Sequence, residues 1–258
     1  MDPCSGSGMV NQAPQKTPCE KAKTPTLNST TILKNPEVQS KMDAVLKSKI
    51  NAANEYAVSV GKNSNGTYSV SPPNEGGATE GTVPPVVSGL YVADGHSHTN
   101  GNFGVPSPGD FYNFILQFPA NPYLASRFVY GSYFGEAEVY ALVIYNKTLA
   151  QNFINNYPKG QNYNETTHSF SVGSSVGDEY FMAMDFASGG TYIDNTDENY
   201  SPSAMALAYV LGKFNTGISL AKVDANGNLK AISVTKETIV IPGGTGTPKP
   251  GLKVVQCP

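Results

Sequence analysis

The chain has no tryptophan, only three cysteines and three histidines, and few charged residues, which make up 14% of its 258 positions. Its net charge of -3 offers no positive excess that would attract a nucleic-acid backbone or an anionic membrane surface. No apolar run approaches the roughly 20 residues that a transmembrane helix needs. We therefore expect no nucleic-acid partner and no membrane span. The oligomeric state stays open.

The composition instead favours uncharged polar residues. Asparagine, serine, threonine, glycine and tyrosine are plentiful beside a hydrophobic fraction of 39%, and the length suffices for a buried core. A low charge with many such residues is typical of exported bacterial proteins. The N-terminus lacks an apolar signal core, but a mature protein would have lost one. We expect a periplasmic, cell-surface or secreted location.

The cysteines permit one long-range bridge. Cys19 and Cys257 flank almost the whole chain, and a disulfide between them would contribute roughly 4–5 kcal/mol in the chain-entropy model. Cys4 would then be left over, as a lipid-anchor position or an unrelated residue. The alternative is three unrelated thiols. None belongs to a CxxC pair, which argues against a cysteine-zinc site.

The first third of the chain divides into a leader, a helix and two strands. Residues 1–34 are rich in proline, threonine, serine and lysine and predict an extended leader. Asn35 and Pro36 are typical of a helix start. That helix has one apolar face, made by Val38, Met42, Val45, Leu46 and Ile50. Strands are predicted at 56–60 and 90–93, with a loop at 62–87 between them.

A second helix start follows at Ser107, with Pro108 at its first position and Asp110 as the capping carboxylate. Further along, the pattern predicts strands at 128–134, 138–145 and 180–186, helices at 148–157 and 202–214, and a hairpin of strands 218–223 and 229–234. This order of elements indicates one α/β (or α+β) domain, with a mixed β-sheet flanked by helices.

His96 and His98 are two of the three histidines. Residues two apart in a strand point to the same side, so both imidazoles can reach one metal ion. Asp110 follows at a helix start and is a natural third ligand. Three ligands with one open position are typical of a catalytic zinc site, with one zinc per chain. The alternatives are polar residues at a strand end and an ordinary capping box, which does not exclude a metal.

A hydrolase also needs a base. Glu55 lies where the first helix meets strand 56–60, and a carboxylate there can take a proton from a metal-activated water. Ser107 can donate a hydrogen bond to the developing oxyanion. The alternatives are a solvated glutamate at a helix end and a plain N-cap.

Three segments together resemble the JAB/MPN (JAMM) zinc metallopeptidases: Glu55 heading a strand that ends at Gly61, then the His96-Ser97-His98 triplet, then a Ser-x-x-Asp from Ser107 to Asp110. The resemblance implies that His96, His98 and Asp110 bind zinc. It implies that Glu55 positions and deprotonates water and that Ser107 helps to bind the oxyanion.

The resemblance also implies a JAB/MPN (cytidine-deaminase-like) architecture, with a metallohydrolase core at 35–157 and a C-terminal elaboration at 158–258 packed on the same domain. The whole chain looks similar to exported Bacteroidetes-type members of the family. The implied activity is zinc-dependent attack of water on an amide, and the implied substrate is a peptide or an isopeptide-linked protein.

Two features depart from the family pattern. The spacing between His98 and Ser107 is one residue longer than usual, which the glycine-rich segment 100–104 would have to absorb. Thr99 stands where many members have proline. Neither change removes a ligand.

Three rival interpretations remain. The segment 94–99 also resembles the opening of PHP-type phosphoesterases, but those enzymes need several further histidines and only His168 is left. A metallo-β-lactamase-like site fails because no Asp-His follows His98. The third alternative is a non-catalytic JAB/MPN-fold binding or scaffold protein, since many members have lost metal ligands.

Overall fold

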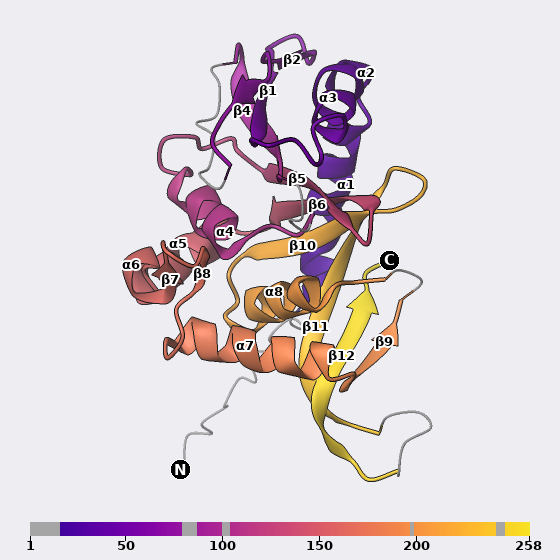
Figure 1. The fold of residues 1–258 in the computed structure, drawn as a ribbon. Helices are drawn as coiled ribbons and strands as arrows, with labels where there is room; N and C mark the ends of the chain where they lie inside the picture. The colour runs from indigo at the N-terminus through magenta and orange to yellow at the C-terminus, as the bar shows by residue number, and fades with distance from the viewer. Residues whose placement is uncertain (1–15, 79–86, 100–103, 197–198, 241–245) are drawn as a thin grey trace, which may run out of the picture.

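A ten-stranded mixed sheet forms the centre of the α+β domain (Figure 1). The computed structural model describes residues 16–78, 87–99, 104–196, 199–240 and 246–258. The sheet contains β1 (Tyr56–Lys62), β2 (Tyr68–Val70), β3 (Asn74–Glu75), β4 (Leu90–Ser97), β5 (Ser126–Tyr133), β6 (Glu136–Ile144), β9 (Tyr192–Asn195), β10 (Ile218–Val223), β11 (Leu229–Ile239) and β12 (Lys249–Gln256).

The strand order is β2-β1-β4-β5-β6-β10-β11-β12-β9, and β3 also pairs with β1. β4 pairs in parallel with β5, and β9 with β12, whereas the other neighbours are antiparallel. The parallel pair β4 and β5 is joined by the helix α4 (Pro108–Leu116). Such a crossover returns the chain along the sheet, so α4 begins near the carboxyl end of β4.

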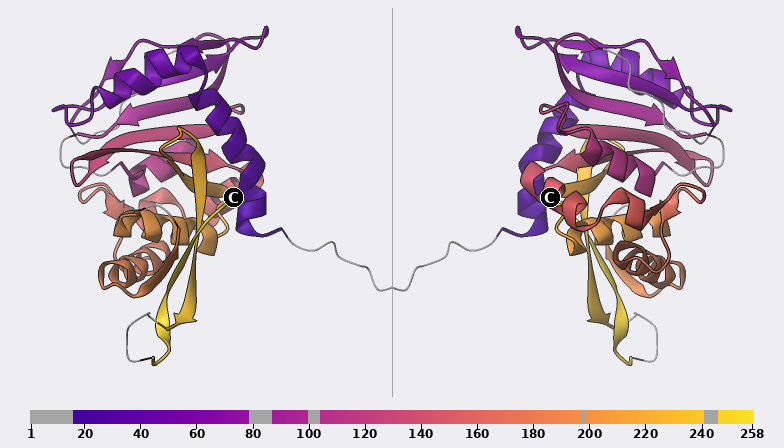
Figure 2. Two further views of the ribbon diagram at one scale, coloured as in Figure 1. Left: turned by 90° about the vertical axis from the view of Figure 1, so that its right-hand side faces the viewer. Right: turned by 90° about the vertical axis from the view of Figure 1, so that its left-hand side faces the viewer.

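Helices cover both faces of this sheet (Figure 2). One face packs against α1 (Pro18–Leu33) and a segment made of α2 (Pro36–Val38), the π-helical turn η1 (Gln39–Asp43) and α3 (Ala44–Lys47). The other face packs against α4, α5 (Lys147–Asn156), α7 (Ser175–Ser188) and α8 (Pro202–Lys213). Each side has its own buried apolar cluster.

A small hairpin lies outside the main sheet. It follows α6 (Lys159–Asn162) and consists of β7 (Tyr163–Asn164) and β8 (Ser169–Phe170). Phe170 is buried and joins the cluster of α4 and α7, so the hairpin is seated against α4.

Many predicted elements are confirmed. The strand at 56–60 is β1, and the strands at 128–134 and 138–145 are β5 and β6. The helices at 148–157 and 202–214 are α5 and α8, and the hairpin 218–234 is β10 and β11. The helix from Asn35 exists, although its middle turn is π-helical. The mixed sheet flanked by helices is confirmed as well.

The extended leader is a wrong prediction for residues 18–33, which form α1. Thr17 and Glu20 close a capping box at its start, and a proline occupies the first helical position. The helix buries four small or polar side chains, those of Ala22, Thr26, Ser29 and Thr30, and two large apolar ones at its end, Ile32 and Leu33. An apolar period is therefore nearly absent from the sequence.

The strand predicted at 180–186 is also wrong, because these residues lie within α7. Its buried positions Val176, Tyr180, Ala183 and Ala187 follow the helical period, which the dense aromatic and methionine residues between them obscured. The loop predicted at 62–87 contains β2 and β3, and its residues 79–86 lie outside the described part of the chain. The strands β9 and β12 were not predicted.

Of the two alternatives for the cysteines, the structure has the bridge between Cys19 and Cys257, which ties the start of α1 to the residue after β12. Residues 192–256 contribute four strands to the same sheet as β1 and β4, so the C-terminal region packs on the one domain. Among the described residues, no helix is long and apolar enough to cross a membrane.

Candidate metal centre

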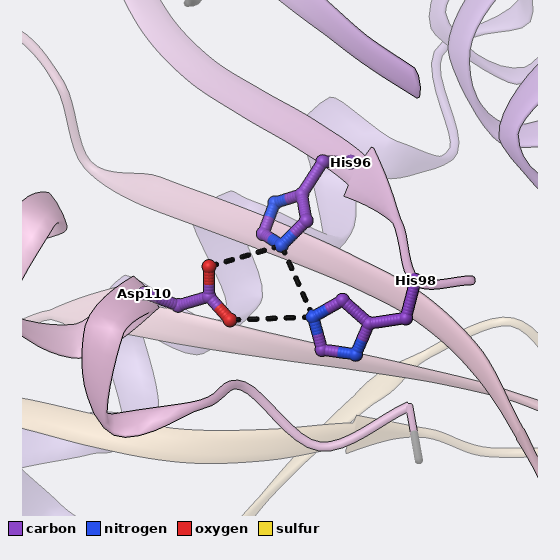
Figure 3. A group of neighbouring side chains, drawn as sticks. All are labelled: His96, His98 and Asp110. Atoms are coloured by element: carbon purple, nitrogen blue, oxygen red, sulfur yellow. Dashed lines mark hydrogen bonds and ion pairs between the residues drawn. The ribbon is translucent and has the colours of Figure 1, made fainter. Parts of the chain in front are cut away.

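Three predicted ligands converge where β4 ends and α4 begins (Figure 3). The Nε2 atoms of His96 and His98 are 3.3 Å apart. Oδ1 of Asp110 lies 3.0 Å from His96 Nε2, and its Oδ2 lies 3.3 Å from His98 Nε2. Both histidines are buried, at 8% and 7% exposure. Within the described residues, these three side chains form the one group with metal-ligand geometry.

These distances fit one metal ion. Ligand atoms about 2.0–2.1 Å from a tetrahedral zinc are separated from each other by roughly 3.3 Å, which matches the observed contacts. Hydrogen bonds alone do not account for the arrangement. The two Nε2 atoms carry at most two protons, so at least one of the three contacts, two with the carboxylate and one between the histidines, would lack a hydrogen. A single cation satisfies all three groups.

Asp110 is both a capping residue and a member of the group. Its Oδ2 accepts from the Ser107 backbone N–H at 2.7 Å, while its own N–H donates to Ser107 Oγ at 3.0 Å. Burial on its own would raise the pKa of Asp110, but attraction to His96 and hydrogen bonds from both histidines hold it well below the usual range. The residue is therefore a carboxylate, as a metal ligand must be.

The structure places Glu55 beside this group. It directly precedes β1, whose Tyr56 pairs with Ser97, so Glu55 stands level with His98 on the neighbouring strand. Its backbone is fixed by hydrogen bonds with Gly76 and Gly77, and its side chain is buried. Burial raises the pKa of Glu55 and outweighs the opposing attraction of His96 and His98. A raised pKa suits a carboxylate that gains and loses a proton.

Ser107 also reaches the site, but its hydroxyl group has other partners. Ser107 Oγ donates to Asp110 Oδ2 at 2.8 Å and accepts from the Asp110 N–H. The hydroxyl would have to rotate away from Asp110 to donate to a substrate oxygen. In this geometry it orients the carboxylate of Asp110, which is a role of an outer-shell partner.

A buried ion pair behind the group joins α4 to the sheet. Arg127 donates from Nε and Nη2 to the two carboxylate oxygens of Asp94, both at 2.8 Å. Its Nη1 donates to the backbone carbonyl of Asp110 at 3.2 Å. The Tyr91 hydroxyl completes the cluster by donating to Asp94 Oδ2 at 2.6 Å. Arg127 thereby sets the first turn of α4 against the strand that carries His96.

The group opens on a pocket of about 400 Å³. His98, Asp110, Glu55 and Ser107 line one side of it. The lining also includes residues of the C-terminal region, namely Tyr163, Thr167, His168, Tyr180 and Ser203. His98 and His168 therefore share one pocket, and His96 adjoins it through its contact with His98. Sequence reasoning missed His168 and Tyr163, because no local pattern connects the 163–170 hairpin with residues 96–110.

Of the two departures from the family pattern, the structure describes Thr99 but only the last residue of the glycine-rich segment 100–104. Thr99 donates from Oγ1 to the carbonyl of Ala78 at 3.1 Å, which anchors the chain just after His98. Residues 100–103, which were expected to absorb the extra residue, lie outside the described part of the chain. Asp110 nevertheless reaches both histidines.

Comparison with protein-family models, curated proteins and solved structures gives no match to this chain.

Proposed function

We propose that this protein is a zinc-dependent hydrolase of the JAMM type that cleaves amide bonds in peptides or isopeptide-linked proteins. The observation that carries the proposal is the convergence of His96, His98 and Asp110 at zinc-like spacing, beside a pocket that His98 and Asp110 line together with the buried Glu55. Three ligands facing a pocket leave a coordination position accessible, as catalytic zinc sites do.

When bound, zinc supplies positive charge that acidifies water to a pKa of about 7 and polarises a carbonyl. The protein supplies the proton transfers. Glu55, held beside the ligands with its pKa raised by burial, accepts the proton of the attacking water. The same carboxyl group then gives this proton to the leaving amine nitrogen as the C–N bond breaks. Glu55 thus takes up one proton and returns it in each turnover.

Ser107 serves this chemistry in two ways. Its hydroxyl orients the Asp110 carboxylate, and rotation about χ1 would turn the same O–H towards the oxygen of a substrate carbonyl in the pocket. Arg127 and Asp94 hold α4 in place, so the ligand geometry is set before substrate arrives.

The arrangement of elements supports the family assignment as a proposal. Glu55 heads β1, β1 pairs with the strand that carries His96, and the Ser107–Asp110 turn opens the next helix. This is the order of the JAB/MPN pattern. An exported location is likewise proposed, and the Cys19–Cys257 disulfide supports it because such bridges persist in oxidising compartments.

The test compares wild type with Glu55→Gln, which keeps the size of the side chain and removes the base. Both proteins are loaded with zinc and assayed against a mixed library of peptides and isopeptide-linked ubiquitin-like conjugates. We expect Glu55→Gln to bind zinc as wild type does and to lose about 10²–10⁴-fold in rate. Glu237→Gln, an exposed glutamate on β11, is the matched control and keeps full activity.

Equal rates in wild type and Glu55→Gln would show that Glu55 is not the base. Zinc binding with no cleavage of any library member by wild type would instead indicate a binding or scaffold protein of this fold.

A further inference from the structure

The β7–β8 hairpin contributes Tyr163, Thr167 and His168 to the lining of the pocket that contains His98 and Asp110. His168 lies in its turn with a left-handed backbone conformation, φ 51°, and is exposed to the pocket that it lines. A non-glycine residue in this region is uncommon. His168 does not belong to the group of metal ligands. It is therefore an accessible imidazole that faces the site and has no part in the proposed hydrolytic chemistry.

Tyr163 fixes both the hairpin and the imidazole. A Cβ at position 109 would lie 2.8 Å from the Tyr163 hydroxyl, so only glycine there lets this hydroxyl sit against the first turn of α4. The same Tyr163 Oη is 3.4 Å from His168 Nδ1. Burial raises the pKa of Tyr163 to about 12, so the phenol keeps its proton. With that proton donated to Nδ1, one of the two directions that this contact allows, the neutral imidazole carries its N–H on Nε2, which can donate to a ligand.

The two ends of the pocket differ in charge. Among the described lining residues, both carboxylates, Glu55 and Asp110, are at the metal end. The hairpin end has neutral donors and His168, and Lys159 stands behind it. Lys159 Nζ lies 4.6 Å from the centre of the Tyr163 ring and 3.3 Å from Asn113 Oδ1. Lys159 also forms an ion pair at 2.8 Å with Glu165, a solvent-exposed carboxylate outside the pocket lining, which balances its charge.

We propose that His168 is a specificity-determining residue that binds a carboxylate of the substrate. Its Nε2–H donates to the carboxylate, while the scissile amide lies at the metal end. The inference rests on the proposed function and narrows its substrate class to peptides or conjugates with an acidic group close to the cleaved bond. Charge-assisted hydrogen bonds of this kind are about twice as strong as neutral ones.

The probe is N-acetylglycine, which has an amide and a carboxylate, with N-acetylglycinamide as its uncharged match. Because the chain has three histidines, NMR of the full protein resolves three imidazoles, and His168→Ala assigns one of them. Titrations are made with metal-free and zinc-loaded protein. The variants are His168→Ala, His168→Gln, which keeps a donor, and Tyr163→Phe. Thr166→Ala is the control in the same turn.

We expect N-acetylglycine to shift the His168 signals saturably, with and without zinc, and N-acetylglycinamide to bind at least about 10-fold more weakly. His168→Ala should weaken N-acetylglycine binding by about 10-fold, His168→Gln by less, and Thr166→Ala not at all. Tyr163→Phe should also weaken N-acetylglycine binding, because it removes the hydroxyl group that contacts His168 Nδ1.

Three outcomes would overturn the inference: no binding, equal affinity in His168→Ala, or shifts confined to His96 and His98 in the zinc form. The last would mean that the metal holds the carboxylate. The metal-free titration needs no zinc, so it fails only if the subsite is absent. Failure of the proposed function would instead appear as absent zinc binding or absent hydrolysis while N-acetylglycine still binds at the subsite.

Discussion

The two faces of β4 have opposite roles. On one face, Gly95 packs so closely on the η1–α3 segment that a Cβ there would lie 2.9 Å from Leu46 Cδ1, and Ala93 joins the same apolar cluster. On the other face, Asp94 binds Arg127 and His96 contacts the α4 carboxylate. Because side chains alternate along a strand, Ala93 and Gly95 lie on one side, the packing face, and Asp94 and His96 lie on the other, the chemical face.

Polar groups confined to one face of β4 allow a buried polar site and a packed apolar core to share one strand. The histidines and carboxylates replace apolar core on one face only, and the packing face behind them holds the strand in place. Changes to the packing face should therefore act on stability and leave the ligands unchanged. Changes to the chemical face should act mainly on metal binding.

The largest expected effect on the packing face comes from the disulfide that anchors α1. Replacing both Cys19 and Cys257 by alanine should lower the free energy of unfolding by about 5 kcal/mol, because the bridge closes a loop with a sequence separation of 238. Urea denaturation measures this loss, and zinc affinity of the folded protein should not change. A large loss of zinc affinity would show that the two faces are coupled.

Arg127→Met should lower both stability and zinc affinity, because Arg127 makes a buried contact on the chemical face that also stabilises the fold. Asp94 would remain as a buried charge with its main partner removed, which costs about 3–5 kcal/mol. Zinc affinity should fall by about 10–100-fold as α4 loses its hold on the sheet.

Arg127→Lys keeps the charge without the planar fork and should fall between wild type and Arg127→Met in both measurements. Unchanged zinc affinity in Arg127→Met would mean that the ion pair does not position Asp110.

Gly95→Ala tests the packing face alone. The added methyl group meets Leu46 and Met42, so it should destabilise by about 1–3 kcal/mol. One zinc per chain should still bind. Met42→Ala makes room for the added methyl group, so Gly95→Ala should cost less in the Met42→Ala protein than in wild type, and an equal cost would show that the clash lies elsewhere.

Local patterns allowed much of the site to be predicted. The period of two between His96 and His98 and the capping box from Ser107 to Asp110 act within a few residues, so the sequence alone indicated that these side chains could meet. β4 was predicted only to residue 93, yet it runs to Ser97. His96 therefore lies within the strand, and the N–H of His98, just beyond it, donates to the carbonyl of Tyr130.

What could not be predicted depends on contacts between distant segments or on weak local patterns. α1 buries threonine and serine, so its start at Thr17–Glu20 was the one available indication. The aromatic density of 180–186 suggested a strand, although burial follows the helical period there. The contact of Tyr163 with Gly109 joins segments far apart in the chain, and no local pattern encodes it.

The smallest expected effect is the pH dependence of stability that arises from Glu55. Because burial raises its pKa in the folded protein, Glu55 contributes most to stability when protonated, and this contribution is lost as pH rises through the folded pKa. Metal-free Glu55→Gln should thus gain melting temperature over wild type as the pH rises above the ordinary glutamate value. A difference that shrinks over this range would contradict a raised pKa.

The most direct test of the central claim is the zinc content of tag-free protein, measured by mass spectrometry and titration calorimetry. Wild type is compared with His98→Ala and Asp110→Ala, with His168→Ala as the control histidine. We predict one zinc per chain in wild type and in His168→Ala, and its loss in the other two variants. No zinc in wild type, or equal zinc in all four proteins, would contradict it.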